Sequence, residues 1–317
     1  MKKALLIGIN YYSVPGNTLN GCINDIKNMS TILTSKFGYD ASNVTMLRDD
    51  ATTLSMMPTR ANMLEQLNAL IAASANYSEI WIHYSGHGSQ VIDRNGDEKD
   101  GLDEVIVPVD FRKNGFITDD TLRDILSKSK CRTFILLDSC HSGTGCDLEW
   151  SFEYTGNGFV RTQNNRATIS NTQIFMISGC KDSQKSVDYY DTTDKQYEGA
   201  FTDMFLKALQ QNNYNVSLSK LYKDTYVLLA NNRFTQRPIF SSTSSNPIYT
   251  LIPTTTRSDV TKPISTKEVV QNNMKDIILG NIIDNQSVPI VKILIYSQNN
   301  TEQIKNNMKN ILTLGYF

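Results

Sequence analysis

The stretch Glu79-Ile80-Trp81-Ile82-His83-Tyr84-Ser85-Gly86-His87-Gly88 runs from an apolar segment into a histidine between two glycines. Its first part, residues 79–84, has the length and composition of a buried β-strand. A second apolar segment, residues 133–137, runs in the same way into Asp138-Ser139-Cys140-His141-Ser142-Gly143. The sequence therefore predicts an imidazole and a thiol that each follow a buried strand.

Further elements alternate along the chain. Three more apolar runs are predicted strands, at residues 4–9, 44–47 and 173–177. Apolar residues recur at helical spacing over residues 23–37, 61–72, 121–126, 201–209 and 218–229. Strands that alternate with helices predict an α/β fold, with a mainly parallel sheet and helices on both faces. Functional sites of such sheets lie at the carboxyl ends of the strands, where His87 and Cys140 are expected.

Composition and charge exclude several classes of protein. The 317 residues carry a formal net charge of -1, with 40% apolar and 20% charged residues. This balance indicates no nucleic-acid partner, and no apolar run reaches the roughly 20 residues of a membrane span. The run at residues 4–9 is too short for a signal peptide. The five cysteines are odd in number and show no CxxC spacing, so we expect free thiols and a cytoplasmic protein.

Cys140 and His87 are a candidate nucleophile and base. A free thiol has a pKa of about 8.5 and is mostly protonated at neutral pH, so a nearby imidazole helps to activate it. The backbone N–H groups of Gly88 and Cys140 are candidate oxyanion donors. Taken alone, a cysteine that ends an apolar strand is more often a packed core residue. His141 is a rival base, but neighbouring side chains of an extended segment point in opposite directions.

Six ordered motifs, spread over about residues 3–252, resemble the metacaspases, relatives of the caspases, and within them the compact type I group. They cover residues 4–11, 19–25, 84–88, 103–110, 137–143 and 177–182. The resemblance implies a caspase-like three-layer sandwich with a mostly parallel sheet. It implies a peptidase domain at 1–252, with a large-subunit region at about 1–148, a junction loop at about 149–172 and a small-subunit region at about 173–252. Residues 253–317 lie outside it, as an Asn-rich extension.

The resemblance also implies an activity. Metacaspases are cysteine endopeptidases that cleave protein or peptide substrates after Arg or Lys, and they act as monomers. By position, Asp25 and Asp138 match the acids of the substrate pocket, with Cys22 and Ser85 beside them. An acidic pocket suits a substrate cation. From the residues alone, capping of a helix start is the more common role for a residue placed as Asp25 is.

A calcium site is implied by the same resemblance. Four carboxylates match those that bind activating calcium in type I metacaspases: Asp103, Asp119, Asp120 and Asp147. Acidic oxygens without a nearby Cys or His ligand suit a hard cation. The alternative is ordinary surface turns, with Asp119 and Asp120 at a helix start. Residues 93–104 begin like an EF-hand loop, but Glu98 stands where that loop needs glycine, so an EF-hand is rejected.

The stretch at residues 149–173 is rich in Gly, Asn, Thr and Arg and is predicted to be an exposed loop. It contains Arg161 and Arg166, which are candidate points of self-cleavage for an enzyme of basic specificity. Family members often carry Cys where this chain has Ser139, a change that leaves the dyad intact. Two other functions stay open: a catalytically silent caspase-like scaffold and a calcium-responsive binding protein. An α/β hydrolase is disfavoured because the chain lacks Gly-x-Cys-x-Gly.

Overall fold

The computed structural model describes residues 1–94, 96, 101–140, 145–164, 167–180, 188–191 and 195–254. Several positions considered above lie outside these residues: Glu98, His141, Arg166 and all but the first two residues of the expected extension at 253–317.

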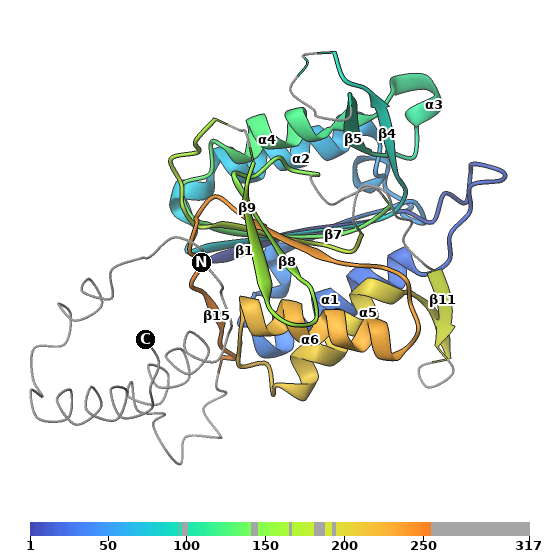
Figure 1. Cartoon of the computed structure of the whole chain (residues 1–317). Helices are drawn as coiled ribbons and strands as arrows, with labels where there is room; N and C mark the ends of the chain where they lie inside the picture. The colour runs from blue at the N-terminus through green and yellow to red at the C-terminus, as the bar shows by residue number, and fades with distance from the viewer. Residues whose placement is uncertain are drawn as a thin grey trace, which may run out of the picture. The chain divides into compact units, whose positions relative to one another are not determined.

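An eight-stranded sheet forms the middle layer, in the order β2-β1-β3-β7-β10-β14-β8-β9 (Figure 1). The first five of these strands in that order run parallel, and the last three are antiparallel to their neighbours. Their bounds are β1 Lys2–Gly8, β2 Val44–Arg48, β3 Glu79–Ser85, β7 Arg132–Asp138, β10 Ile174–Ser178, β14 Ile239–Ser242, β8 Trp150–Tyr154 and β9 Phe159–Gln163. The five predicted strands are confirmed, with ends within two residues.

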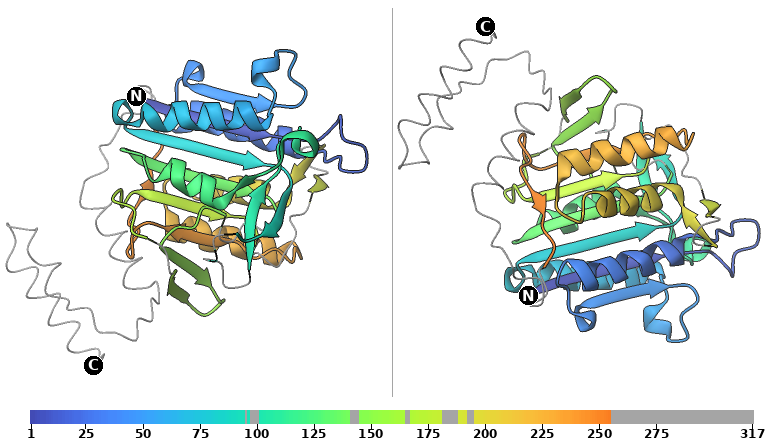
Figure 2. Two further views of the ribbon diagram at one scale, coloured as in Figure 1. Left: turned by 90° about the horizontal axis from the view of Figure 1, so that it is seen from above. Right: turned by 90° about the horizontal axis from the view of Figure 1, so that it is seen from below.

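Helices cover both faces of this sheet (Figure 2). One face carries α2 (Arg60–Ala72) and α4 (Asp119–Leu126), and the other carries α1 (Cys22–Lys36), α5 (Ala200–Gln211) and α6 (Leu218–Asn231). The five predicted helices and the predicted three-layer α/β sandwich of caspase-like type are confirmed. Among the described residues, no helix combines the length and the apolar character needed to cross a membrane.

Both faces of the sheet are buried, which explains the continuous apolar runs of its parallel strands. In β1, Leu5 and Ile7 belong to the core under α2 and α4, whereas Ala4 and Leu6 belong to the core under α1 and α5. Helices α2 and α4 begin at side-chain caps. The Thr59 side chain accepts from the Asn62 N–H, and the Thr118 side chain accepts from the Thr121 N–H. The starts of these two helices are therefore set by local sequence.

Smaller elements complete the described part of the chain. They are a sheet of β4 (Gly88–Ile92), β5 (Leu102–Ile106) and β6 (Ile117–Thr118), the pairs β11 (Asp188–Asp191) with β12 (Gln196–Gly199) and β13 (Val216–Ser217) with β15 (Thr250–Leu251), and the short helix α3 (Phe111–Asn114). Three single 3-10 turns lie at Ala41–Asn43, Leu54–Met56 and Ser74–Asn76. In the small sheet, β4 begins directly after His87, the candidate base.

The predicted loop at residues 149–173 is wrong in part. Strands β8 and β9 form a hairpin that extends the main sheet, and Phe152 packs on Phe240 with ring centroids 5.3 Å apart. Trp150, Phe152 and Tyr154 alternate with polar residues, which is a strand pattern. The Gly- and Asn-rich composition of the flanking turns masked this short alternation.

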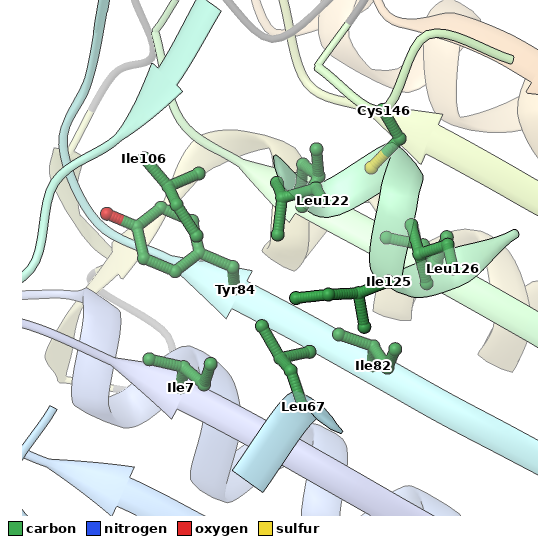
Figure 3. Close-up of a pocket in the computed structure, with 11 residues that line it drawn as sticks. Ile7, Leu67, Ile82, Tyr84, Ile106, Leu122, Ile125, Leu126 and Cys146 are labelled. Carbon is green, nitrogen blue, oxygen red and sulfur yellow. The ribbon is translucent and has the colours of Figure 1, made fainter. Parts of the chain in front are cut away.

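A small cavity lies between the sheet and helices α2 and α4 (Figure 3). Its volume is about 20 Å³, and its walls are apolar side chains apart from Tyr84 and Cys146. A space of this size holds about one water molecule, which needs polar partners that this lining does not provide. The cavity is a packing gap in the core and does not form a substrate pocket.

Candidate active site

The carboxyl ends of β3 and β7 bring the two candidate catalytic segments together. Ser85 pairs with Asp138 in the sheet, and the Gly86 N–H donates to the Asp138 carbonyl oxygen at 3.2 Å. Just beyond, Gly88 lies so close to Cys140 that a β-carbon on it would stand 1.9 Å from the Cys140 carbonyl oxygen. The second glycine of Gly-His-Gly is therefore needed for this close approach. Cys140 is half-buried, whereas the other four cysteines are buried.

A backbone carbonyl fixes the imidazole of His87. Its Nε2 lies 2.7 Å from the carbonyl oxygen of Asn17. Because a carbonyl oxygen only accepts hydrogen bonds, Nε2 must carry a proton, and Nδ1 is the basic nitrogen of the neutral ring. Asn17 could not be predicted from the sequence, because its contribution comes from the main chain of a loop.

Asp25 and Asp138 face each other behind these strand ends. Both are buried, and a β-carbon on Gly199 would stand 2.6 Å from Oδ2 of Asp25 and 2.4 Å from Oδ2 of Asp138. Ser85 Oγ donates to Asp25 at 2.6 Å, and the Gly199 N–H does so at 2.9 Å. Thr202 donates to Oδ2 of Asp138 through its N–H at 2.9 Å and its hydroxyl at 2.8 Å. Two carboxylate oxygens thus converge on Gly199, and the lack of a β-carbon there lets them come this close.

Burial raises the pKa of Asp25 well above its usual 3.8, and the charge of Asp138 raises it further. Hydrogen bonds from Ser85 and Gly199 act in the opposite direction. A cation placed beside this pair would offset both costs at once. Of the predicted pocket residues, the structure brings Asp25, Ser85 and Asp138 together. Cys22 is buried at the first residue of α1, one turn before Asp25.

Three of the four predicted calcium ligands form a second acidic group. Asp103 on β5 and the first two residues of α4, Asp119 and Asp120, each offer a carboxylate oxygen within 4.8 Å of the others. The pKa of Asp119 is raised to about 9. Burial is the main cause, and the negative charge of Asp147 is the second. Asp147 therefore lies close enough to interact with this group. Carboxylate oxygens grouped in this way fit a hard cation such as Ca²⁺.

Sequence reasoning missed a third acidic group. Asp191, Glu198 and Asp203 also come within 4.8 Å of one another. Here Lys207 Nζ lies 2.8 Å from Asp191 and 2.7 Å from Asp203, so a side-chain cation already shares the group. Its members come from the β11–β12 hairpin and from α5, and no motif links them in the sequence.

Comparisons with known proteins agree on one family. A family model described as the metacaspase, peptidase C14 domain matches residues 2–149. Metacaspase-1 of Scheffersomyces stipitis is 33% identical over 287 residues, covering 76% of this chain and 70% of that protein. Metacaspase-1A of Aspergillus oryzae is 34% identical over 304 residues, covering 79% of this chain and 69% of that protein.

A solved structure supports the fold. Protein GSU0716 from Geobacter sulfurreducens superposes with a TM-score of 0.51 at 23% identity, covering 82% of this chain and 97% of that one. At this identity the similarity concerns the fold alone.

Proposed function

This chain belongs to the metacaspase family of cysteine peptidases, and from that premise we propose that it is a calcium-stimulated endopeptidase that cleaves after Arg or Lys. In this proposal Cys140 is the nucleophile and His87 its base. The observation that carries it is the buried pair of carboxylates, Asp25 and Asp138, directly behind the strand ends that present His87 and Cys140.

The proposed chemistry follows from how His87 is held. With Nε2 bonded to the Asn17 carbonyl, Nδ1 accepts the proton of the Cys140 thiol. The thiolate attacks the scissile carbonyl carbon, and the imidazolium then donates its proton to the leaving amine. Water, deprotonated by the same imidazole, hydrolyses the thioester and restores the thiol. The backbone N–H groups of Gly88 and Cys140 are the proposed donors to the oxyanion.

Specificity in this proposal depends on charge. In the proposal the P1 side chain reaches Asp25 and Asp138, whose carboxylate oxygens converge where Gly199 lacks a β-carbon. A guanidinium or ammonium group there pairs with two carboxylates that are otherwise held close together in a buried setting. An acidic P1 side chain would instead add a third negative charge. Ser85 keeps Asp25 in place, and Cys22 completes the proposed wall.

Calcium would be held by the carboxylates of Asp103, Asp119, Asp120 and Asp147. The ion would supply positive charge that offsets their mutual repulsion. Since these residues lie on β5, on the first turn of α4 and after β7, binding would draw three segments together. This gives calcium an activating role apart from the bond-breaking chemistry.

The proposal extends to the organisation of the protein. We infer a peptidase domain at 1–252 that acts as a monomer on protein or peptide substrates. Its five free cysteines support a location in the reducing cytoplasm. Self-cleavage is proposed for the region 149–172, between the large- and small-subunit regions. The mass of the chain after incubation with calcium tests this step.

The decisive experiment is hydrolysis of fluorogenic peptides that end in Arg, Lys or Asp, with calcium or with chelator. We expect cleavage after Arg and Lys, with calcium required, and none by Cys140→Ala. Cleavage after Asp would overturn the pocket assignment while keeping the dyad. No cleavage under any condition, with calcium binding retained, would favour the silent scaffold or the calcium-responsive binding protein.

A further inference from the structure

Two tyrosine hydroxyls hold the backbone of His87 from both sides. The His87 N–H donates to Oη of Tyr11 at 3.0 Å, and Oη of Tyr84 donates to the His87 carbonyl oxygen at 2.6 Å. The two hydroxyl oxygens lie 3.1 Å apart, and both side chains are buried. The peptide groups before and after the His87 α-carbon are therefore each bonded to one tyrosine hydroxyl.

The protons of this pair can be assigned from their partners. Oη of Tyr11 lies 2.6 Å from the carbonyl oxygen of Val107, which only accepts, so Tyr11 donates there. The Val107 N–H donates to Oη of Tyr84 at 3.2 Å and also directly to the His87 carbonyl oxygen at 3.2 Å. Burial is the main cause that raises the pKa of both tyrosines above the usual 10.0, so both stay protonated at neutral pH. The hydroxyl pair thus ties the chain after β5 to both backbone groups of His87.

The local backbone is shaped around this contact. Tyr11 has a φ of 56°, in the left-handed region that side chains other than glycine rarely adopt. A β-carbon on Gly86 would stand 2.7 Å from Oη of Tyr84 and 3.2 Å from Oη of Tyr11, so the first glycine of Gly-His-Gly makes room for the hydroxyls. The ring of Tyr11 also packs on the imidazole, with centroids 4.5 Å apart. Strain maintained beside a reactive side chain points to a role in function.

We propose that Tyr11 and Tyr84 are positioning residues that set the place and orientation of the His87 imidazole relative to Cys140. The inference rests on the proposed function, in which His87 is the base. Removing the Tyr11 hydroxyl leaves the His87 N–H and the Val107 carbonyl oxygen without this partner, and the His87 backbone shifts. A base transfers a proton only within hydrogen-bond reach, so the shift lowers kcat and leaves substrate binding nearly unchanged.

Tyr222 provides a matched control. It is also fully buried, and its hydroxyl accepts from the Tyr154 N–H and donates to the Pro238 carbonyl oxygen, both at 2.9 Å. It lies in the core on the opposite face of the sheet from Tyr11. Tyr11→Phe and Tyr222→Phe therefore remove the same kinds of hydrogen bond, but only Tyr11→Phe affects His87.

The test compares these variants, and Tyr84→Phe, by two measurements. The first is the pH dependence of Cys140 alkylation by iodoacetamide, which reports the thiol–imidazole pair without any substrate, and Cys140 is the half-buried cysteine. The second is kcat and KM on a peptide that the wild type cleaves. We expect Tyr11→Phe to slow alkylation at neutral pH and lower kcat about ten- to a hundredfold, at similar KM. Tyr84→Phe should act in the same direction, and Tyr222→Phe should match the wild type.

The proposal is overturned if the two site variants alkylate like the wild type and keep its kcat. It is also overturned if Tyr222→Phe shows the same losses, because the effect would then be one of general stability. Should Tyr11→Phe fail to fold, Tyr84→Phe decides alone. A wild-type chain that cleaves no peptide would count against the proposed function, and the alkylation profiles would still decide the role of the tyrosines.

Discussion

Gly199 lies against Asp138 so closely that a β-carbon at position 199 would stand 2.4 Å from the Asp138 Oδ2 atom. The same β-carbon would stand 2.6 Å from Oδ2 of Asp25. Gly199 has an extended backbone, with a φ of -71°, so glycine is not required there by its conformation. Glycine is required at position 199 because a β-carbon there would collide with the carboxylate oxygens of Asp138 and Asp25.

Gly199→Ala should therefore damage substrate binding more than chemistry. The added methyl group fills the space proposed for the P1 cation and pushes the carboxylates apart. Losing a buried charge pair costs about 2 kcal/mol or more, so kcat/KM for Arg peptides should fall roughly thirtyfold, mainly through KM. Steady-state kinetics check this, with Cys140 alkylation as the control for an intact dyad. An unchanged KM would remove Gly199 from the pocket.

Thr202→Val should weaken the binding of Arg substrates, because it removes a hydrogen bond to Asp138. The valine keeps the shape of the side chain and the backbone N–H, but it removes the hydroxyl that donates to Asp138 at 2.8 Å. Hydrogen bonds to charged groups contribute about 1.5–3 kcal/mol, so we expect KM for Arg peptides to rise roughly tenfold or more. Thr225→Val is the matched control, because its buried hydroxyl donates to the Leu221 carbonyl oxygen one turn earlier in α6. Equal KM values in the two variants would contradict the prediction.

Much of this site could be predicted because its main residues follow strands. Cys140 and His87 could be predicted as candidates from the sequence, since each follows shortly after a continuous apolar run with the length of a buried strand. Gly199 and Thr202 could not be found in this way. They reach the proposed pocket from a later part of the chain, Gly199 through its missing side chain and Thr202 through hydrogen bonds to Asp138.

The acid pair should also make stability depend on pH. The pKa of Asp25 is raised in the folded chain, so the folded state holds a proton at pH values where the unfolded state has lost it. The free energy of unfolding should therefore fall as pH rises from about the usual 3.8 towards the raised pKa. Urea unfolding from pH 4 to 8 measures this slope, and Asp25→Asn should flatten it. The expectation would be contradicted if the free energy of unfolding rose over this pH range by the same amount in the wild type and in Asp25→Asn.

Calcium should stabilise the protein through the acidic group on β5 and α4. A ligand that binds only the folded state raises the midpoint of thermal unfolding, so we expect an increase with calcium and a smaller one with magnesium. Asp103→Asn should abolish most of the increase. Asp124→Asn is the control, because Asp124 lies on the same helix α4 but pairs with Lys128 at the surface. If Asp103→Asn kept the full calcium-dependent increase in the unfolding midpoint, calcium would have to bind elsewhere than at this acidic group.

The region around Arg161 shows where sequence reasoning failed and why it matters. Composition predicted an exposed loop, whereas β9 is paired with β8 along the sheet. Short strands joined by Gly-rich turns give a weak signal, and their packing on Phe240 from a distant strand could not be anticipated. Arg161, a candidate cleavage point in the predicted loop, therefore lies within a β-hairpin.

Arg161 should resist self-cleavage for this reason. Peptidases bind their substrates as extended, accessible segments, but Arg161 pairs with Phe152 in the sheet, donates to the Ser245 carbonyl oxygen at 3.1 Å and stacks over Trp150. Cleavage after it requires the hairpin to open, which loses these contacts together. After incubation with calcium, intact-mass analysis should show no fragment ending at Arg161, and Arg161→Gln should give the same fragments as the wild type. A fragment ending at Arg161 at early times would mean that the hairpin opens readily.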